Sequence, residues 1–337
     1  MTSPLLKKQK LCSEIDDISI HPHIIYKLKE AKLYTFQAIL HLSYSELQKI
    51  AKITSSEAQI VLESISEALL KHKVITAFDM LHNEDSTVKG KLICDLLKNG
   101  SGNCDCIYTS SITEICGESG CGKTQLCLYL SICAQMPTSI GGLNSKVVYI
   151  HSEGDFPIKR FLQMANAFKN KHPKLQNIKL SDNLILKKVF NLGQLMYVLQ
   201  KGLPELLKKV NNLKIIIIDS VAALLRSEYD SLNERTSLLL QLATEIWKLA
   251  NINGMAVICV NQVSGSNKGN GKTNLDVPSL GLLWSNILTT RIKISRNSSE
   301  NNVPSTRNLG LIFSSYHSHL CNNFIISENG INIIGGS

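Results

Sequence analysis

The sequence predicts an α/β protein whose core is a mainly parallel sheet and whose N-terminal part is a small all-helical domain. Residues 111–126 follow the order of a strand, a glycine-rich turn and the start of a helix. From there to about residue 288, strand patterns alternate with helical patterns, which is typical of a mainly parallel sheet. Before residue 74, apolar residues recur at the spacing of amphipathic helices. Two domains of different class are therefore expected.

These patterns divide the chain into four segments. Residues 1–17 are expected to be a disordered tail, and residues 18–73 the helical domain. Residues 74–110 form a linker and the start of the core, and residues 111–337 form the core itself. The helices of the N-terminal domain are expected at residues 21–31, 34–41, 43–52 and 55–71.

The first turn of the third helix carries a capping signal. Ser43 precedes the helical pattern and Glu46 follows three residues later, which predicts a capping box.

In the core, we expect five strands connected by four helices and by loops. The strands are expected at residues 111–116, 146–152, 183–189, 213–219 and 255–261. The helices are expected at residues 123–134, 157–170, 192–210 and 231–251. Beyond residue 288, four short strands are expected to close the sheet in antiparallel fashion, at residues 289–295, 308–314, 323–327 and 331–334.

Composition narrows the class of protein. The net charge of +9 over 337 residues favours a polyanionic partner. No apolar run approaches the length of a membrane span, and residues 1–10 lack the apolar centre of a signal peptide. The ten cysteines are scattered without a C-x-x-C pair, so we expect a reduced intracellular protein with no zinc site.

Residues 117–124 carry the phosphate-binding pattern G-x-x-x-x-G-K-[ST]. Its glycines let successive backbone N–H groups point at one anion, and the following helix adds its positive N-terminal end. Lys123 is suited to the β- and γ-phosphates and the Thr124 hydroxyl to Mg²⁺. The residues expected to contact the nucleotide are Gly117, Glu118, Ser119, Gly120, Cys121, Gly122, Lys123, Thr124 and Gln125.

Three polar residues end strands of the same predicted sheet, where ligands collect in open α/β folds. Asp219 follows four consecutive isoleucines and is a second candidate for the magnesium shell. Glu153 is either a group that activates water or a solvated glutamate in a turn. Gln262, which follows the last core strand, could hydrogen-bond a γ-phosphate.

Two segments are candidates for DNA contact. Residues 263–274 carry Lys268 and Lys272 among Gly, Ser and Asn, with no acidic or aromatic residue. Such a basic segment, expected to be mobile when free, suits a nucleic-acid backbone, although a plain surface insertion would have the same composition. Residues 226–235, with Arg226 and Arg235, are a weaker candidate because their charge is mixed.

Together these segments resemble the eukaryotic RecA-type recombinases and their paralogs. The resemblance rests on residues 112–126, on 148–156 with Arg160, on 217–226 and on 261–263. It implies a RecA-like P-loop ATPase core with a mainly parallel sheet, preceded by a small all-helical N-terminal domain, and it implies ATP and Mg²⁺ as cofactors. By this resemblance Glu153 activates water, Asp219 holds magnesium, Gln262 senses the γ-phosphate and Arg160 packs near adenine.

The resemblance further implies that residues 227–235 and 263–280 are the two DNA-binding loops, and that protomers stack with ATP between them. The sequence departs from a self-sufficient recombinase at three places. Residues 50–55 lack the glycine with which the helical domain approaches DNA. Val74 replaces the phenylalanine that docks on a neighbour, at a cost of about 1–2 kcal/mol of burial. Residues 313–316 replace an Asp and a Pro that cap the neighbour's ATP.

These departures, with residues 117–119 and 280–286, look most like an accessory paralog of that family. The expected function is that of a nuclear DNA repair protein of homologous recombination, with weak DNA-dependent ATPase activity. Its expected partners are another RecA-type paralog in a heterodimer, the main recombinase, and single-stranded or branched DNA. No association with a membrane is expected. Two alternatives stay open: a strand-exchange recombinase that forms its own filament, and a structural ATP-binding adaptor that makes no DNA contact.

Overall fold

The computed structural model describes residues 14–18, 20–69, 91–92, 107–226, 232–264, 277–278, 280–296, 306–316 and 321–334. The chain divides into two compact units, Met1–Val88 and Lys89–Ser337. The predicted tail up to residue 13, the linker around Val74, and the lysines Lys268 and Lys272 lie outside the described residues.

The first unit is helical, as predicted, and its helices pack on one apolar core. Every helix contributes residues to that core, among them the buried Leu28, Ile39, Leu47 and Ile65. The elements are η1 (Ile15–Asp17), α1 (Pro22–Glu30), α2 (Phe36–Leu40), α3 (Tyr44–Ala51) and α4 (Ser55–Leu69).

Two capping boxes fix the turns before α3 and α4. The predicted box is confirmed: the Ser43 N–H donates to Glu46 Oε2 at 2.8 Å, and the Glu46 N–H donates to Ser43 Oγ at 3.3 Å. Thr54 and Glu57 form the same pair of bonds, at 2.8 and 3.3 Å. Between the helices Lys52 adopts the left-handed conformation, with φ of 52°, where glycine would carry no steric cost.

The second unit is built on one large sheet, which confirms the predicted fold class. The strand order is β12-β11-β10-β9-β3-β7-β6-β4-β5, with β8 paired to β7. Neighbours from β5 to β9 are parallel, and β9 to β12 are antiparallel. The strands of this order are β3 (Ser111–Gly117), β4 (Lys146–His151), β5 (Leu184–Lys188), β6 (Leu213–Asp219), β7 (Ala256–Ser264), β9 (Thr290–Arg296), β10 (Arg307–Ser314), β11 (Cys321–Ser327) and β12 (Gly330–Ile334). The shorter strands are β1 (Lys91–Leu92), β2 (Ile107–Tyr108) and β8 (Val277–Pro278).

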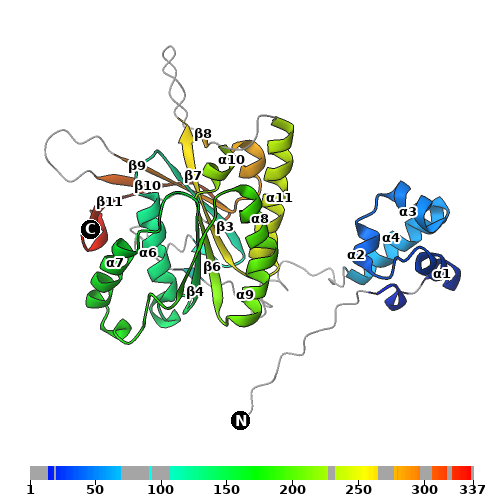
Figure 1. Ribbon diagram of the computed structural model, residues 1–337, viewed down its shortest axis with the longest axis horizontal. Helices are drawn as coiled ribbons and strands as arrows, with labels where there is room; N and C mark the ends of the chain where they lie inside the picture. Colours follow the sequence, from blue (N-terminus) through cyan, green and yellow to red (C-terminus); the bar gives the residue numbers. More distant parts are fainter. Residues whose placement is uncertain are drawn as a thin grey trace, which may run out of the picture. The chain divides into compact units, whose positions relative to one another are not determined.

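Helices cover both faces of this sheet (Figure 1). One face packs against α6 (Lys123–Gln135) and α7 (Ile158–Lys171). The other packs against α8 (Leu192–Tyr197), α9 (Leu203–Lys209), α10 (Val221–Arg226) and α11 (Leu232–Asn251). Short helical segments complete the unit: η4 (Thr138–Ile140), η5 (Pro173–Leu175) and α12 (Gly281–Ser285). Among the described residues, no helix has the length and apolar content needed to span a bilayer.

The structure differs from the sequence prediction at several places. Residues 14–17, expected in the disordered tail, belong to the helical unit: Ile15 is buried in its core, and the Ile15 N–H donates to the carbonyl oxygen of Tyr34 at 3.1 Å. The helix expected over 192–210 is interrupted by a π-helical turn, η6 (Val198–Gly202). Pro204, the second residue of α9, has no N–H to donate to the preceding turn, which explains the local widening. Strand β7 also continues past Gln262, because Val263 and Ser264 pair with β8. Gln262 therefore lies within the strand and not after it.

Candidate nucleotide-binding site

The glycine-rich turn joins β3 to α6, as the motif predicts, and two of its glycines, Gly117 and Gly122, leave no room for side chains. A Cβ on Gly117 would lie 2.2 Å from the carbonyl oxygen of Ile294 and 2.8 Å from Cys121 Sγ. Gly122 caps α6 with φ of 109°, and a Cβ there would meet Ile326 at 2.7 Å. Residues of β9 and of the antiparallel strand β11 thus pack closely against the loop, which forms a compact cradle at the N-terminus of α6.

A pocket of about 350 Å³ lies over this cradle. It brings together most of the residues that the sequence predicted for the nucleotide site, because β3, β4, β6 and β7 end at one edge of the sheet. The predicted residues that line it are Ser119, Gly120, Gly122, Lys123, Thr124, Gln125, Glu153, Asp219 and Gln262. Gly117, Glu118 and Cys121 belong to the loop but are not among the lining residues.

Lys123 is held inside the loop by backbone carbonyls. Its side chain is buried, and Nζ donates to the carbonyl oxygens of Gly117 at 2.9 Å and Glu118 at 2.7 Å. Cys121 Sγ lies 3.9 Å from the same nitrogen. Burial raises the pKa of the Cys121 thiol, so the loop gains no thiolate that would oppose a phosphate at neutral pH.

The candidate magnesium residues are in direct contact. Thr124 Oγ1 donates to Asp219 Oδ2 at 2.8 Å, and the Tyr149 hydroxyl donates to the same oxygen at 2.7 Å. Burial raises the pKa of Tyr149 well above its usual value, so the phenol stays a neutral donor. A hydroxyl and a carboxylate are hard oxygen ligands of the kind that Mg²⁺ prefers, and this pair fits the ion.

Glu153 reaches the pocket from the segment after β4, and Gln262 reaches it from within β7; these two strands lie on either side of β6. Glu153 is exposed and follows β4, whose last residue, His151, pairs with Asp219. Gln262 pairs with Gly117 in the sheet register, so it stands beside the start of the phosphate loop. An acid and an amide therefore face the same space as the phosphate loop.

Arg160 supports the pocket without lining it. Its Nε donates to Gln125 Oε1 at 2.8 Å, and its Nη2 donates to the carbonyl oxygen of Ser327 at 2.6 Å. Nη1 donates to the carbonyl oxygen of Glu328 at 2.8 Å. The guanidinium thereby joins α7, the pocket residue Gln125 and the β11–β12 turn. Its contact with adenine stays a prediction.

Two arginines near the pocket were missed by the sequence analysis. Arg307, at the start of β10, lines the pocket, and Arg296 Nη2 at the end of β9 donates to the Gly120 carbonyl oxygen at 2.9 Å. Burial, and then the nearby charge of Arg296, lower the pKa of Arg307, although an arginine stays cationic. The sequence contains little indication of these two arginines, because β9 and β10 carry no recognisable motif. Both strands are brought close to the loop by the pairing of β9 with β3.

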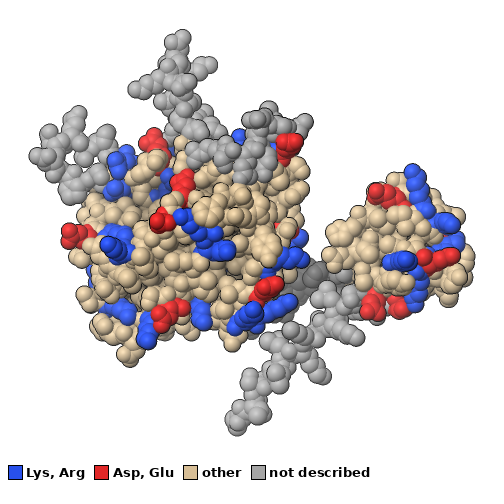
Figure 2. All heavy atoms as spheres, in the orientation of Figure 1, with Lys and Arg blue, Asp and Glu red and all other residues tan. Residues whose placement is uncertain are grey.

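Of the four candidate DNA-binding residues, Arg226 and Arg235 are among the described residues, whereas Lys268 and Lys272 are not. Arg226 ends α10, and Arg235 lies on α11 beside a separate hollow that Leu239 and Leu282 also line. On the face shown in Figure 2, described Lys and Arg side chains are interspersed with acidic and uncharged ones and form no continuous basic tract.

Comparisons with known proteins agree with this architecture. The sequence matches the Rad51 family over residues 94–332, and the XRCC3/RpoA-like, helix-hairpin-helix domain over residues 15–69. It is 34% identical to the DNA repair protein XRCC3 homolog of Arabidopsis thaliana, over 71% of this chain and 90% of that protein. It is 28% identical to the DNA repair protein XRCC3 of Bos taurus, over 96% of this chain and 99% of that protein.

A protein from Metallosphaera sedula is also similar over most of this chain. The DNA repair and recombination protein RadA of Metallosphaera sedula is 30% identical over 77% of this chain and 78% of that protein. The resemblance inferred from the motifs is thus confirmed, and the chain belongs to the Rad51 family of RecA-type proteins.

Proposed function

We propose that this chain is an accessory protein of homologous-recombination DNA repair that binds ATP and helps to assemble or stabilise a recombinase filament on DNA. The observation that carries the proposal is the pocket in which Lys123, Thr124, Asp219, Glu153 and Gln262 meet at one sheet edge. The similarity to proteins named DNA repair protein XRCC3 supports a role in DNA repair, and we propose the accessory role and a nuclear location with it.

The proposed cofactors are ATP and Mg²⁺. Lys123 and the N-terminus of α6 provide positive charge for the phosphates, and Arg307 adds a second cation on the pocket wall. Thr124 and Asp219 would hold the magnesium ion, which neutralises phosphate oxygens when it is bound. Glu153 is positioned to orient or deprotonate a water molecule, and Gln262 to sense the γ-phosphate.

The proposed protein partners are another RecA-type paralog, in a heterodimer, and the main recombinase. The residues that follow β10 support an association with a different RecA-type protein over the stacking of copies of this chain. The Ser315 N–H donates to the carbonyl oxygen of Thr289 at 2.9 Å, and the Tyr316 ring packs on Tyr108 with centroids 4.5 Å apart. These residues contact their own unit, at the position where the resembling recombinases cap a neighbour's ATP.

Sedimentation with single-stranded DNA and ATP tests this proposal. We expect the purified chain to form no long filaments, and a second RecA-type protein to co-purify with it from the native source at a one-to-one ratio. Long self-filaments with vigorous DNA-stimulated ATP hydrolysis would instead establish the strand-exchange alternative.

Glu153→Gln should separate binding from hydrolysis. The amide keeps the size of the side chain but cannot accept a proton from water, so turnover should fall about 100-fold while ATP affinity stays within about 3-fold. Single-turnover hydrolysis of labelled ATP and equilibrium dialysis provide the two measurements. Asp155→Asn is the matched control, because Asp155 is an exposed neighbouring acid that pairs with Lys188 at 2.8 Å. An unchanged rate in Glu153→Gln would exclude this role.

Neutralising Lys268 and Lys272 tests the DNA contact. If both lysines bind phosphates, the double change to glutamine should weaken binding to single-stranded DNA and lower the slope of log affinity against log salt by about 1.4. The control is Lys208→Gln with Lys209→Gln, two exposed lysines of α9 with the same total charge. Unchanged affinity and slope in the first variant would favour the adaptor without DNA contact.

A further inference from the structure

The two carboxylates that line the pocket are carried by neighbouring strands, and each has a serine beside it in the chain. Asp219 is the last residue of β6, and Glu153 comes shortly after the end of β4, the strand that pairs with β6. Ser152 directly precedes Glu153, and Ser220 directly follows Asp219. The way in which the two serines are held therefore affects how the two acids lie relative to each other.

Three hydrogen bonds join Ser152 to the backbone around Asp219. The Ser152 N–H donates to the carbonyl oxygen of Asp219 at 2.9 Å. Ser152 Oγ donates to the carbonyl oxygen of Ser220 at 2.9 Å and accepts from the Ser220 N–H at 3.0 Å. Because a hydroxyl can donate and accept at once, one side chain satisfies both backbone groups of Ser220. These three bonds are called the Ser152–Ser220 clasp below.

On the Asp219 side, the clasp is attached to a well-restrained part of the pocket. Ser220 is buried, and its Oγ accepts from the Ala223 N–H at 3.3 Å, in the first turn of α10. The Asp219 carboxylate accepts from the hydroxyls of Tyr149 and Thr124. Asp219 is thus held both at its carboxylate and at its backbone.

Glu153 has fewer restraints of its own. In the described part of the chain, no hydrogen bond holds its carboxylate, which is exposed at the pocket. Gly154 follows with φ of 59°, and a Cβ on it would meet nothing within 4 Å. The backbone therefore places the Glu153 side chain, and the clasp is the contact that holds this backbone one residue earlier.

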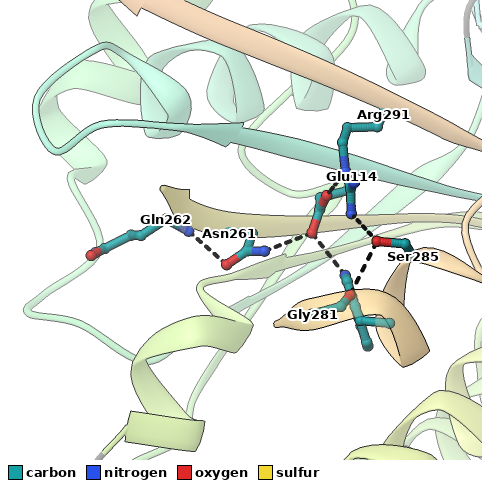
Figure 3. A network of polar contacts seen from close by, with 7 residues as sticks. Glu114, Asn261, Gln262, Gly281, Ser285 and Arg291 are labelled. Carbon is teal, nitrogen blue, oxygen red and sulfur yellow. Dashed lines mark hydrogen bonds and ion pairs between the residues drawn. The ribbon is translucent and has the colours of Figure 1, made fainter. Parts of the chain in front are cut away.

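Gln262, the other polar residue predicted to face the γ-phosphate, is held independently of the clasp. Its backbone N–H donates to Asn261 Oδ1 at 2.8 Å. Asn261 Nδ2 donates at 2.7 Å to the buried carboxylate of Glu114, which also accepts from Trp284 and Arg291 (Figure 3). This network shares no residue with the clasp, so loss of the clasp should leave Gln262 in place.

We propose that Ser152 is a positioning residue for ATP hydrolysis. Its hydroxyl holds the backbone before Glu153 against the backbone after Asp219, so that the acid that activates water keeps a fixed place relative to the acid that holds magnesium. A displacement of about 1 Å in a reacting group can lower a rate about 100-fold. The inference rests on the proposed role of Glu153 in hydrolysis, and it adds the residue that places this acid.

Substitutions of Ser152 with and without a hydroxyl test the proposal. In single-turnover hydrolysis of labelled ATP with Mg²⁺, the rate of Ser152→Ala should fall about 10-fold, because Glu153 loses its fixed place. Its affinity for ATP, measured by equilibrium dialysis, should stay within about 2-fold of wild type, since the phosphate loop is unchanged. Ser152→Thr keeps the hydroxyl and should restore the rate to within about 3-fold of wild type.

Ser145→Ala is the matched control, because it removes a hydroxyl that joins the same two strands at the opposite edge of the sheet. Ser145 is buried just before β4, and its Oγ accepts from the N–H of Lys214 in β6 at 2.9 Å. Both alanine variants should lower the melting temperature, measured by circular dichroism, by similar amounts. Ser145→Ala should nevertheless keep the wild-type rate. An equal loss of rate in both variants would assign the effect to stability and overturn the positioning role.

A double variant shows whether Ser152 acts through Glu153. Residues that act as one unit are not additive, so adding Ser152→Ala to Glu153→Gln should lower the rate by less than about 2-fold further. A full 10-fold further loss, or an unchanged rate in Ser152→Ala alone, would show that Ser152 does not position Glu153, while ATP binding would stand. A wild type that binds ATP without turnover would overturn the positioning role alone, whereas a wild type that binds no ATP would overturn the proposed function as well.

Discussion

Lys123→Ala should lower the affinity for ATP at least about 100-fold and leave the fold intact. The ammonium is the charged donor of the phosphate loop. Charge-assisted hydrogen bonds contribute about 1.5–3 kcal/mol each, so losing two of them exceeds the roughly 2.7 kcal/mol that a 100-fold change in affinity requires. The carbonyls of Gly117 and Glu118, which Nζ contacts here, lose that donor, but the space that the side chain leaves opens onto the pocket that Lys123 lines, so water can replace it. Isothermal titration calorimetry with ATP and Mg²⁺ measures the affinity, and circular dichroism measures the fold.

Lys214→Ala is the control for this change. Lys214 is a half-buried lysine near the amino end of β6, at the edge of the sheet opposite the pocket. The Lys214→Ala variant should bind ATP with the affinity of the wild type. If Lys123→Ala also retained wild-type affinity, the phosphate loop would not be the ATP site and the proposed function would lose its basis.

Glu114→Gln should destabilise the second unit by about 3 kcal/mol or more. The carboxylate is fully buried, and its removal leaves the buried guanidinium of Arg291 without a counter-ion, a change that typically costs 3–5 kcal/mol. Urea unfolding followed by tryptophan emission measures the loss. Glu118→Gln, an exposed glutamate four residues later, should change the free energy of unfolding by less than about 0.5 kcal/mol.

A second change separates charge from packing at this position. Adding Arg291→Met to Glu114→Gln removes the uncompensated cation and should recover part of the lost stability, because buried ion pairs are often replaceable by apolar side chains. Equal stability of Glu114→Gln and wild type would show that the carboxylate carries little of the folding energy. No recovery in the double variant would show that the loss comes from Asn261 and Trp284, the other two donors.

The local part of the nucleotide site was predictable because each residue is marked by its own surroundings in the chain. Gly117, Lys123 and Thr124 stand at motif spacing, and Asp219 follows an unbroken apolar strand. Parallel strands end at one sheet edge, so the meeting of Asp219 with Thr124 followed from the fold class once the strands were assigned. The π-helical turn before Pro204 escaped prediction because helical periodicity continues through it.

The amino-acid sequence by itself determined the two-part architecture, the phosphate loop and the family, because periodicity and motif spacing are local properties. Only the tertiary structure decided the place of Arg307 in the pocket wall and the partners of Glu114. Asn261 and Arg291 lie 147 and 177 residues from Glu114 in the chain, and meet it because β7 and β9 flank β3. An acidic residue in an apolar strand indicates that it is buried with hydrogen-bond partners, but which residues are its partners depends on the order in which the strands pair.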